Sequence, residues 1–179
     1  SNTEMKNGIR KREENRGFEI EGKTIGLIGY GKTGKSFAKK LSGFNCNIIF
    51  CDIKTNLGDN YAREVKINEL KETSDIISLH TNLNQSSRHI IDKQFIDDCK
   101  KSFCLINTAR GECISNHDLI YGLENDKIIG AGLDVLENEN KDFEGIAVDQ
   151  NLNKLKKFEN VILTPHIAGW SKESKVCLL

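Results

Sequence analysis

The sequence predicts an α/β fold in which a doubly wound parallel sheet carries helices on both faces. Short apolar runs alternate with segments of helical spacing along the 179 residues, and this alternation is typical of parallel sheets covered on both sides. A glycine-rich turn follows the first apolar run, and polar residues follow most of the later runs. These observations also predict that functional residues gather at one edge of the sheet, beyond the carboxyl ends of its strands.

Six apolar runs are the predicted strands. In chain order they are residues 24–28, 48–51, 76–79, 103–106, 128–133 and 161–163. The predicted helices are a segment that ends at Leu41, residues 65–72, residues 92–100 with Asp92 as N-cap, a helix opened by Ser115, and a helix that reaches Lys157. Residues 3–16 are polar and compatible with a helix, and Ser171 is expected to cap a final helix.

The glycine-rich turn, Gly29-Tyr30-Gly31-Lys32-Thr33-Gly34, lies between the first strand and the first helix. Gly29 allows a tight turn, Gly31 lets the backbone approach a pyrophosphate, and Gly34 lets the helix pack close to the strand. The N–H groups at the helix start, with Lys32 and Thr33, then face the phosphates. Alternatively, these glycines serve only turns and packing. The order of strand, turn, helix, second strand and acid favours dinucleotide binding.

The second predicted strand ends at Asp52, eighteen residues after Gly34. A carboxylate at this place accepts hydrogen bonds from the ribose diol of an adenosine, and its charge repels a 2′-phosphate. The sequence therefore predicts NAD rather than NADP as the cofactor. The nearby Lys54 weakens that preference a little.

Composition argues against several other classes of function. Lysine plus arginine and aspartate plus glutamate number 26 each, so no net charge indicates nucleic acid or an anionic membrane as a partner. No run of about eighteen apolar residues predicts a transmembrane helix. The six cysteines form no Cys-x-x-Cys pair and the four histidines have no zinc-type spacing, so no metal site is expected. We expect free thiols and a cytoplasmic location.

Further polar residues lie just past the predicted strands, namely His80, Thr81, Arg110, Asp134 and His166. Each has an ordinary interpretation, because an arginine suits a surface turn, an aspartate suits a helix cap and a histidine suits a packed loop. Glu139 lies in an acidic run that suits a solvated face. Their placement at one edge favours a functional interpretation, because a guanidinium for a carboxylate and a titratable imidazole suit redox chemistry on hydroxy acids.

Four motifs occur in a family-like order. They are Gly22-Lys23-Thr24 before the glycine-rich turn, Ile106-Asn107-Thr108-Ala109-Arg110-Gly111, Gly130-Ala131-Gly132-Leu133-Asp134-Val135, and Thr164-Pro165-His166-Ile167-Ala168-Gly169. On these motifs, residues 12–176 resemble the D-isomer-specific 2-hydroxyacid dehydrogenase family, and specifically its NAD-binding domain of the Rossmann type. Residues 12–17 and Gly169-Trp170 resemble the branch of D-3-phosphoglycerate dehydrogenase and its relatives.

The resemblance implies a role for each matching residue. Arg110 holds the substrate carboxylate and carbonyl, His166 is the acid/base, and Glu139 hydrogen-bonds the imidazole. Asp134 binds the nicotinamide carboxamide, and the further candidate cofactor contacts are Thr81, Thr108 and Ala109. The implied reaction is hydride transfer between NAD(H) and a small 2-hydroxy or 2-oxo acid, and the implied assembly is a homodimer.

Members of the family also carry a substrate domain, which is absent from this chain. We therefore expect three parts: a connecting helix or linker at residues 1–20, the NAD-binding Rossmann domain at 21–170, and the start of a C-terminal helix at 171–179. The chain alone is expected to bind NAD without useful turnover. Related folds also serve as corepressors, so an NAD(H)-sensing module that recruits peptide partners stays as the alternative function.

Overall fold

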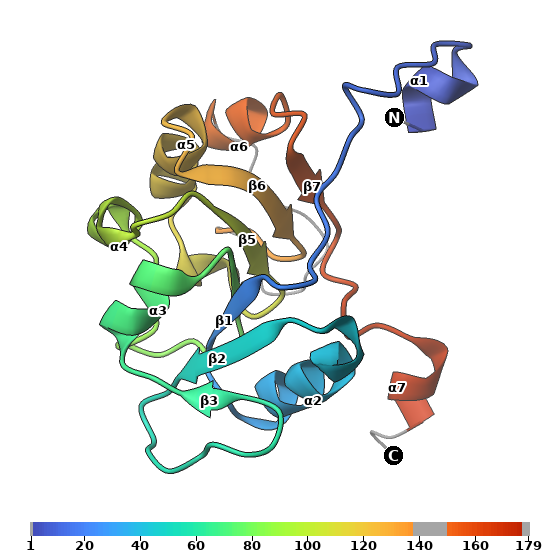
Figure 1. The fold of residues 1–179 in the computed structure, drawn as a ribbon. Helices are drawn as coiled ribbons and strands as arrows, with labels where there is room; N and C mark the ends of the chain where they lie inside the picture. The colour runs from blue at the N-terminus through green and yellow to red at the C-terminus, as the bar shows by residue number, and fades with distance from the viewer. Residues whose placement is uncertain (1, 138–149, 177–179) are drawn as a thin grey trace.

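The computed structural model describes residues 2–137 and 150–176. Within them, seven strands form one sheet in the order β3-β2-β1-β4-β5-β6-β7 (Figure 1). The strands are β1 (Thr24–Ile28), β2 (Asn47–Cys51), β3 (Arg63–Glu64), β4 (Ile76–Leu79), β5 (Phe103–Asn107), β6 (Ile128–Leu133) and β7 (Val161–Leu163). All neighbouring strands are parallel, so their carboxyl ends meet at one edge. The predicted α/β fold with a parallel sheet is confirmed.

Helices lie on both faces of this sheet (Figure 1). On one face are α3 (Ile67–Thr73), α4 (Lys93–Asp98), α5 (Asn116–Glu124) and α6 (Gln150–Leu155), which share a buried core with the strands. On the other face α2 (Lys32–Leu41) packs over the first strands, where Ala38 belongs to a second core with Leu27 and Phe50. The two cores on opposite faces make the sheet doubly wound.

Side-chain caps fix three helix starts where the sequence predicts them. Asp92 Oδ1 accepts a hydrogen bond from the N–H of Phe95 at 2.7 Å, and Ser115 Oγ accepts one from Asp118 at 3.1 Å. Ser171 Oγ accepts from the N–H of Ser174 at 3.0 Å at the start of α7 (Lys172–Val176). These bonds satisfy N–H groups that have no acceptor within a helix.

Two helices have other bounds than the sequence indicates. Residues 63–64 form the edge strand β3, so α3 begins at Ile67 rather than at residue 65. The helix α1 spans only Asn2–Lys6, although residues 3–16 are helix-compatible in composition. It ends because Gly8 adopts a φ of +75° and Ile9 donates its N–H back to the carbonyl of Glu4 at 2.8 Å, a glycine-based C-terminal cap.

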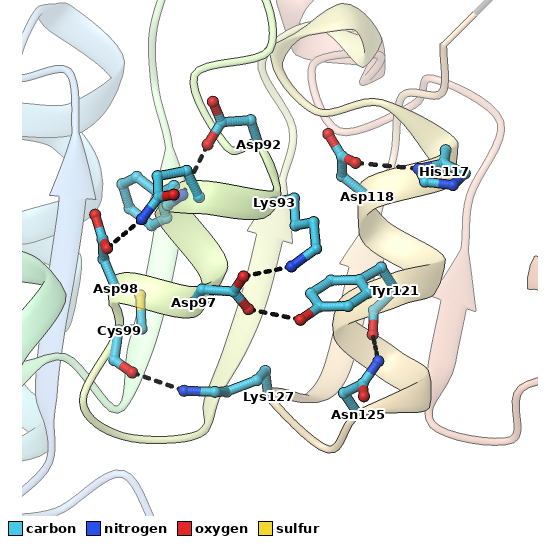
Figure 2. A network of polar contacts seen from close by, with 12 residues as sticks. Asp92, Lys93, Asp97, Asp98, Cys99, His117, Asp118, Tyr121, Asn125 and Lys127 are labelled. Carbon is cyan, nitrogen blue, oxygen red and sulfur yellow. Dashed lines mark hydrogen bonds and ion pairs between the residues drawn. The ribbon is translucent and has the colours of Figure 1, made fainter.

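A polar network joins α4 to α5 on the outer surface of the helical layer that α3, α4, α5 and α6 form (Figure 2). Asp97 accepts hydrogen bonds from Lys93 Nζ and, at 2.7 Å, from the Tyr121 hydroxyl. Lys127 Nζ donates to the carbonyl of Cys99 at 3.0 Å, which ties the end of α4 to the turn before β6. These groups satisfy one another, so the network holds the two helices together away from the carboxyl ends of the strands.

The described cysteines are free thiols, as the sequence predicts. They are Cys46, Cys51, Cys99, Cys104 and Cys113, whereas Cys177 lies outside the described residues. Burial raises the pKa of each of these five thiols, which keeps them protonated near neutral pH. None of the helices in the described part of the chain has the length and apolar character needed to cross a membrane.

Candidate active site

A cavity of about 700 Å³ opens at the carboxyl ends of β1, β2 and β4. Six predicted cofactor residues line it, and they are Gly29, Gly31, Lys32, Thr33, Asp52 and Thr81. The loop after β4 adds Asn84 and Ser87 to the lining. The structure thus brings together residues from three neighbouring strands.

The three glycines of the turn have three different surroundings. Gly29 has a φ of +95°, and a Cβ built there would lie 2.7 Å from the carbonyl oxygen of His80. A Cβ at Gly34 would lie 2.5 Å from the carbonyl oxygen of Gly29, so α2 can approach β1 only with glycine there. A Cβ at Gly31 would meet nothing within 4 Å and would point into open space. Gly29 and Gly34 are therefore needed for close backbone packing, whereas Gly31 leaves room for a ligand.

The start of α2 is suited to an anion. Lys32 and Thr33 are exposed in its first turn, which contains no acidic residue. The N–H groups of this turn lack acceptors within the helix, and the helix dipole adds partial positive charge. The open space beside Gly31 therefore fits a phosphate group.

Asp52 lies half-buried where β2 ends. Its Oδ2 accepts the N–H of Tyr30 at 2.6 Å and its Oδ1 accepts the N–H of Lys54 at 2.9 Å, so the turn and the following loop orient the carboxylate. A carboxylate offers about four acceptor positions, so it can also accept hydrogen bonds from a ribose diol. The donor set and the shape of this cavity fit the adenosine half of a dinucleotide.

Arg110 lies in a turn that the buried side chain of Asn107 shapes. Asn107 Nδ2 donates to the carbonyl of Arg110 at 3.0 Å, and its Oδ1 accepts the N–H of Ala109 at 3.1 Å. Arg110 and Thr108 are exposed, and Arg110 Nη1 donates to the carbonyl of Ala109 at 2.6 Å. Gly111 then passes so close to Leu136 that a Cβ would lie 2.0 Å from its carbonyl oxygen.

Asp134 organises the turn that carries His166. Its Oδ1 accepts hydrogen bonds from Thr164 Oγ1 at 2.6 Å and from the N–H of Ile167 at 2.8 Å, and its Oδ2 accepts the N–H of Ala168 at 2.8 Å. Its main-chain carbonyl accepts the N–H of His166 at 2.8 Å. Burial favours a higher pKa for Asp134, but these hydrogen bonds outweigh it and hold the pKa below its ordinary value.

His166 has a φ of +53°, a left-handed conformation that is uncommon for a residue with a side chain. The bonds from Asp134 to residues on both sides of it hold this conformation. Such backbone outliers cluster at functional sites, where the surrounding structure maintains them.

Backbone hydrogen bonds connect these turns across the sheet. The N–H of Asp134 donates to the carbonyl of Asn107 at 2.9 Å, and the N–H of His166 donates to the carbonyl of Asp134. The turns after β5, β6 and β7, with Arg110, Asp134 and His166, are therefore neighbours. Glu139, the predicted partner of the imidazole, lies outside the described residues.

Comparison with known proteins identifies the family. Residues 1–168 match the model of the NAD-binding domain of the D-isomer specific 2-hydroxyacid dehydrogenases. The chain belongs to this family. NAD is therefore the cofactor, as the glycine-rich turn and Asp52 predict.

Two sequence relatives of this 2-hydroxyacid dehydrogenase domain show how much of a family member it covers. The D-specific alpha-keto acid dehydrogenase of Enterococcus faecium is 35% identical over 167 residues, which are 90% of this chain and 51% of that protein. The hydroxypyruvate reductase of Thermotoga maritima is 36% identical over 171 residues, or 96% of this chain and 54% of that protein. The domain thus spans about half the length of these curated relatives.

Solved structures of the family have the same fold. The pyruvate reductase of Chlamydomonas reinhardtii matches with a TM-score of 0.89 and 30% identity, over 99% of this chain and 57% of that one. A D-isomer specific 2-hydroxyacid dehydrogenase from Lactobacillus delbrueckii ssp. bulgaricus, solved in its NAD complexed form, matches with a TM-score of 0.85 and 30% identity, over 99% of this chain and 59% of that one.

Sequence reasoning did not assign roles to several residues of the domain's site. Asn107 belongs to the motif at residues 106–111, and a polar residue at the end of an apolar strand indicates a turn-forming role of this kind. His80 lines the cavity, contacts the ring of Phe37 at 5.0 Å between centroids, and lies 3.0 Å from Ser78 Oγ through its Nε2. Burial lowers the pKa of His80 to about 4, so it is neutral at physiological pH.

Within the described ranges, no group of three or more His, Cys, Asp or Glu side chains could hold a metal ion.

Proposed function

We propose that this chain is the cofactor half of an NAD-dependent D-2-hydroxyacid dehydrogenase. The reaction would transfer hydride between NAD(H) and a small 2-hydroxy or 2-oxo acid. The observation that carries this proposal is the shared edge of the sheet. The cavity beside Gly31 and Asp52 reaches the end of β4, and β4 pairs with β5, which begins the linked turns of Arg110, Asp134 and His166.

Separate parts of the cavity would hold the two ends of the adenosine diphosphate. The pyrophosphate would lie over Gly31 and the first turn of α2, beside Lys32 and Thr33. The ribose diol would donate to Asp52, whose charge would disfavour the 2′-phosphate of NADP. The turns with Thr81, Thr108 and Ala109 would contact the remainder of the cofactor. Three donors already bond the carboxylate of Asp134, which has about four acceptor positions. The remaining position would accept a hydrogen bond from the nicotinamide carboxamide.

Bound NAD would supply the site that accepts or donates hydride. Arg110 would bind the substrate carboxylate through its planar guanidinium, which matches two carboxylate oxygens. His166 would take the proton of the substrate hydroxyl during oxidation and return it to the carbonyl oxygen during reduction. Glu139 would hydrogen-bond the imidazole and orient it for that transfer.

The substrate is proposed as a class. Named relatives include glyoxylate reductases and D-lactate dehydrogenases, which supports a small 2-oxo acid. Residues 12–17 and Gly169-Trp170 add 3-phosphohydroxypyruvate, the oxidised form of D-3-phosphoglycerate, as a finer hypothesis. We also propose the division at residues 20 and 170, a homodimer of cofactor domains, and a reducing, cytoplasmic environment that suits the free thiols.

The first test is calorimetric titration of the folded chain with NADH and with NADPH. We expect NADH to bind and NADPH to bind at least about tenfold more weakly, because one repelled phosphate readily accounts for 1.4 kcal/mol. Gly31→Ala should weaken NADH binding at a cost in stability of no more than about 1 kcal/mol, since the new methyl group occupies open space at the phosphate site and alanine is only a poorer N-cap of α2 than glycine. Gly43→Ala is the matched control, because its Cβ also meets nothing and it lies outside the cavity.

A folded chain that binds neither dinucleotide would contradict the proposal, and a preference for NADPH would contradict the role of Asp52. Turnover is tested with a protein that carries both domains and a panel of 2-oxo acids. NADH binding without turnover there, together with NADH-dependent capture of a peptide partner, would instead support the NAD(H)-sensing module.

A further inference from the structure

Tyr30 is a fully buried residue inside the glycine-rich turn. Its ring stacks on that of Phe50, with 3.8 Å between the centroids and 10° between the planes. Phe50 belongs to β2, which pairs with β1 immediately before the turn. Two paired strands therefore fix the ring, and the ring fixes the position of its hydroxyl at the side of the cavity.

Tyr30 contacts two carboxylates at opposite ends of the loop that follows β2. Its N–H donates to Asp52 Oδ2 at 2.6 Å, and its hydroxyl donates to Asp59 Oδ1 at 2.8 Å. Asp59 Oδ1 also accepts the N–H groups of Tyr61 at 2.9 Å and Ala62 at 3.3 Å. Asp59 thus shapes its own turn, and Tyr30 attaches that turn to the core.

Residues 53–62, which we name the wall loop, contribute three residues to the wall of the cavity. Ile53, Lys54 and Leu57 line it, and the side chain of Ile53 is 81% exposed. Lys54 is held at the start of the loop by Asp52, and the N–H of Leu57 donates to Glu64 Oε2 at 2.9 Å. The hydroxyl of Tyr30 is a polar link between Asp59 of this loop and the glycine-rich turn, beside the packing of Leu57 and Ala62 in the same apolar cluster as Tyr30.

The two groups of this link have constant charge near neutral pH. Burial first, and then the hydrogen bond to Asp59, raise the pKa of Tyr30, so its hydroxyl stays a donor. Burial favours a higher pKa for Asp59, but the bonds from Tyr61, Tyr30 and Ala62 outweigh it and lower the pKa below its ordinary value. A neutral donor and an ionised acceptor form one of the stronger kinds of hydrogen bond.

We propose that Tyr30 is a positioning residue for the adenosine end of the cofactor site, acting through Asp59 to hold the wall loop in its binding conformation. The proposal rests on the proposed NAD site. A loop that is already in place loses less conformational freedom when a ligand binds, so the link contributes to affinity without touching the cofactor. The ordinary interpretation is a hydrogen bond that affects only the stability of the loop.

The test compares Tyr30→Phe with the unmodified 179-residue chain. Phenylalanine keeps the stack on Phe50 and the N–H bond to Asp52, and it removes only the hydroxyl. We expect the Kd for NADH to rise about fivefold, the size of one net hydrogen bond. The Kd for ADP-ribose, which lacks nicotinamide, should rise by the same factor because the wall loop borders only the adenosine end.

Two substitutions of Asp59 and one of Tyr61 sharpen the test. Asp59→Asn retains an acceptor oxygen for the Tyr30 hydroxyl and should keep the Kd within about twofold of that of the unmodified chain. Asp59→Ala also removes the acceptor of the Tyr61 and Ala62 N–H groups, so it should weaken binding at least as much as Tyr30→Phe. The double variant Tyr30→Phe with Asp59→Ala should be no weaker than Asp59→Ala alone. Tyr61→Phe is the matched control, because the Tyr61 hydroxyl has no hydrogen-bond partner in the described part of the chain.

Each outcome decides between the two interpretations. Unchanged Kd values in Tyr30→Phe and Asp59→Ala, with NADH binding intact in the unmodified chain, would overturn the positioning role and leave the proposed function standing. Weaker binding in Asp59→Asn equal to that in Asp59→Ala would also overturn it, because the acceptor oxygen would then be irrelevant. Failure of the unmodified chain to bind NADH or ADP-ribose would overturn the proposed NAD site itself, and the positioning role with it.

Discussion

The two halves of the candidate site are built in different ways. The cofactor half depends on six consecutive residues, Gly29 to Gly34, and on Asp52 at the end of the next strand. The catalytic half depends on Arg110, Asp134 and His166, which lie in three turns after β5, β6 and β7. Most of the first half comes from one short turn, to which β2 and β4 add single residues, whereas the second half comes from three separate turns that meet only when β5, β6 and β7 have paired in register.

This difference predicts how each half responds to substitution. In the cofactor half, the space beside Gly31 is open, so a side chain can obstruct a ligand without disturbing the fold. In the catalytic half, backbone hydrogen bonds and close backbone contacts connect neighbouring turns, so a substitution there changes the stability of the domain as well as the site. The following predictions test that contrast.

The largest effect is expected for Gly111→Ala in the catalytic half. The new Cβ would lie 2.0 Å from the carbonyl oxygen of Leu136, and two backbone segments must separate to admit it. We expect a loss of about 3 kcal/mol in the free energy of unfolding, near the upper end for overpacking. Thermal denaturation should show a melting temperature lower by about 10 °C for a domain of this size.

The matched control is Gly132→Ala in β6, in the same part of the sheet. Its Cβ would meet nothing within 4 Å, so we expect a change of less than about 0.5 kcal/mol. Equal melting temperatures for Gly111→Ala and the unmodified chain would show that the turns after β5 and β6 are not tightly coupled.

A smaller effect is expected for Asp134→Asn. Asparagine replaces one carboxylate oxygen by an NH₂ group, which cannot accept a hydrogen bond. In either orientation this group faces the N–H of Ile167 or of Ala168, so the turn of His166 loses one or two hydrogen bonds to a charged group. We expect a loss of about 2 kcal/mol, measured by urea denaturation. Asp126→Asn is the control, because this exposed residue has a φ of +54°, which asparagine also tolerates. The same loss in both variants would contradict the role of Asp134 in the turn.

The contrast also explains what the sequence can predict. Six of the seven strands follow from apolar runs, and Asp92, Ser115 and Ser171 indicate helix starts through ordinary capping preferences. The edge strand β3 has only two residues, too few for any periodic pattern, so its pairing with β2 alone defines it. Local signals thus predict local structure.

Contacts between distant residues carry no such signal. Asp134 is predictable as an acid at a strand end, but its three bonds to the 164–168 turn depend on the register of Leu133 with Leu163. The bond from Tyr30 to Asp59 joins residues 29 positions apart and depends on the stack with Phe50. The sequence therefore predicts which residues form the site better than it predicts what holds them.

An effect of similar size, which appears only as the pH falls, concerns His80 at the end of β4, between the two halves. Burial lowers its pKa to about 4 in the folded chain, whereas an unfolded histidine has a pKa of about 6.5. As the pH falls between these values, the unfolded chain binds a proton that the folded chain does not. Stability is therefore lost from about pH 6.5 downward, by roughly 2 kcal/mol at pH 5 relative to neutral pH.

The measurement is urea denaturation of the unmodified chain and of His80→Gln between pH 7.5 and about pH 4.5, above the range in which carboxylates dominate. Glutamine keeps a polar group near Ser78 Oγ and does not titrate, so the variant should lose roughly 2 kcal/mol less than the unmodified chain over this range. His117→Gln, at an exposed imidazole, controls for the substitution itself. Suppose instead that the free energy of unfolding changes in parallel with pH in the unmodified chain and in His80→Gln. His80 would then gain its proton as readily in the folded chain as in the unfolded one, and the cavity wall at β4 would be open to water.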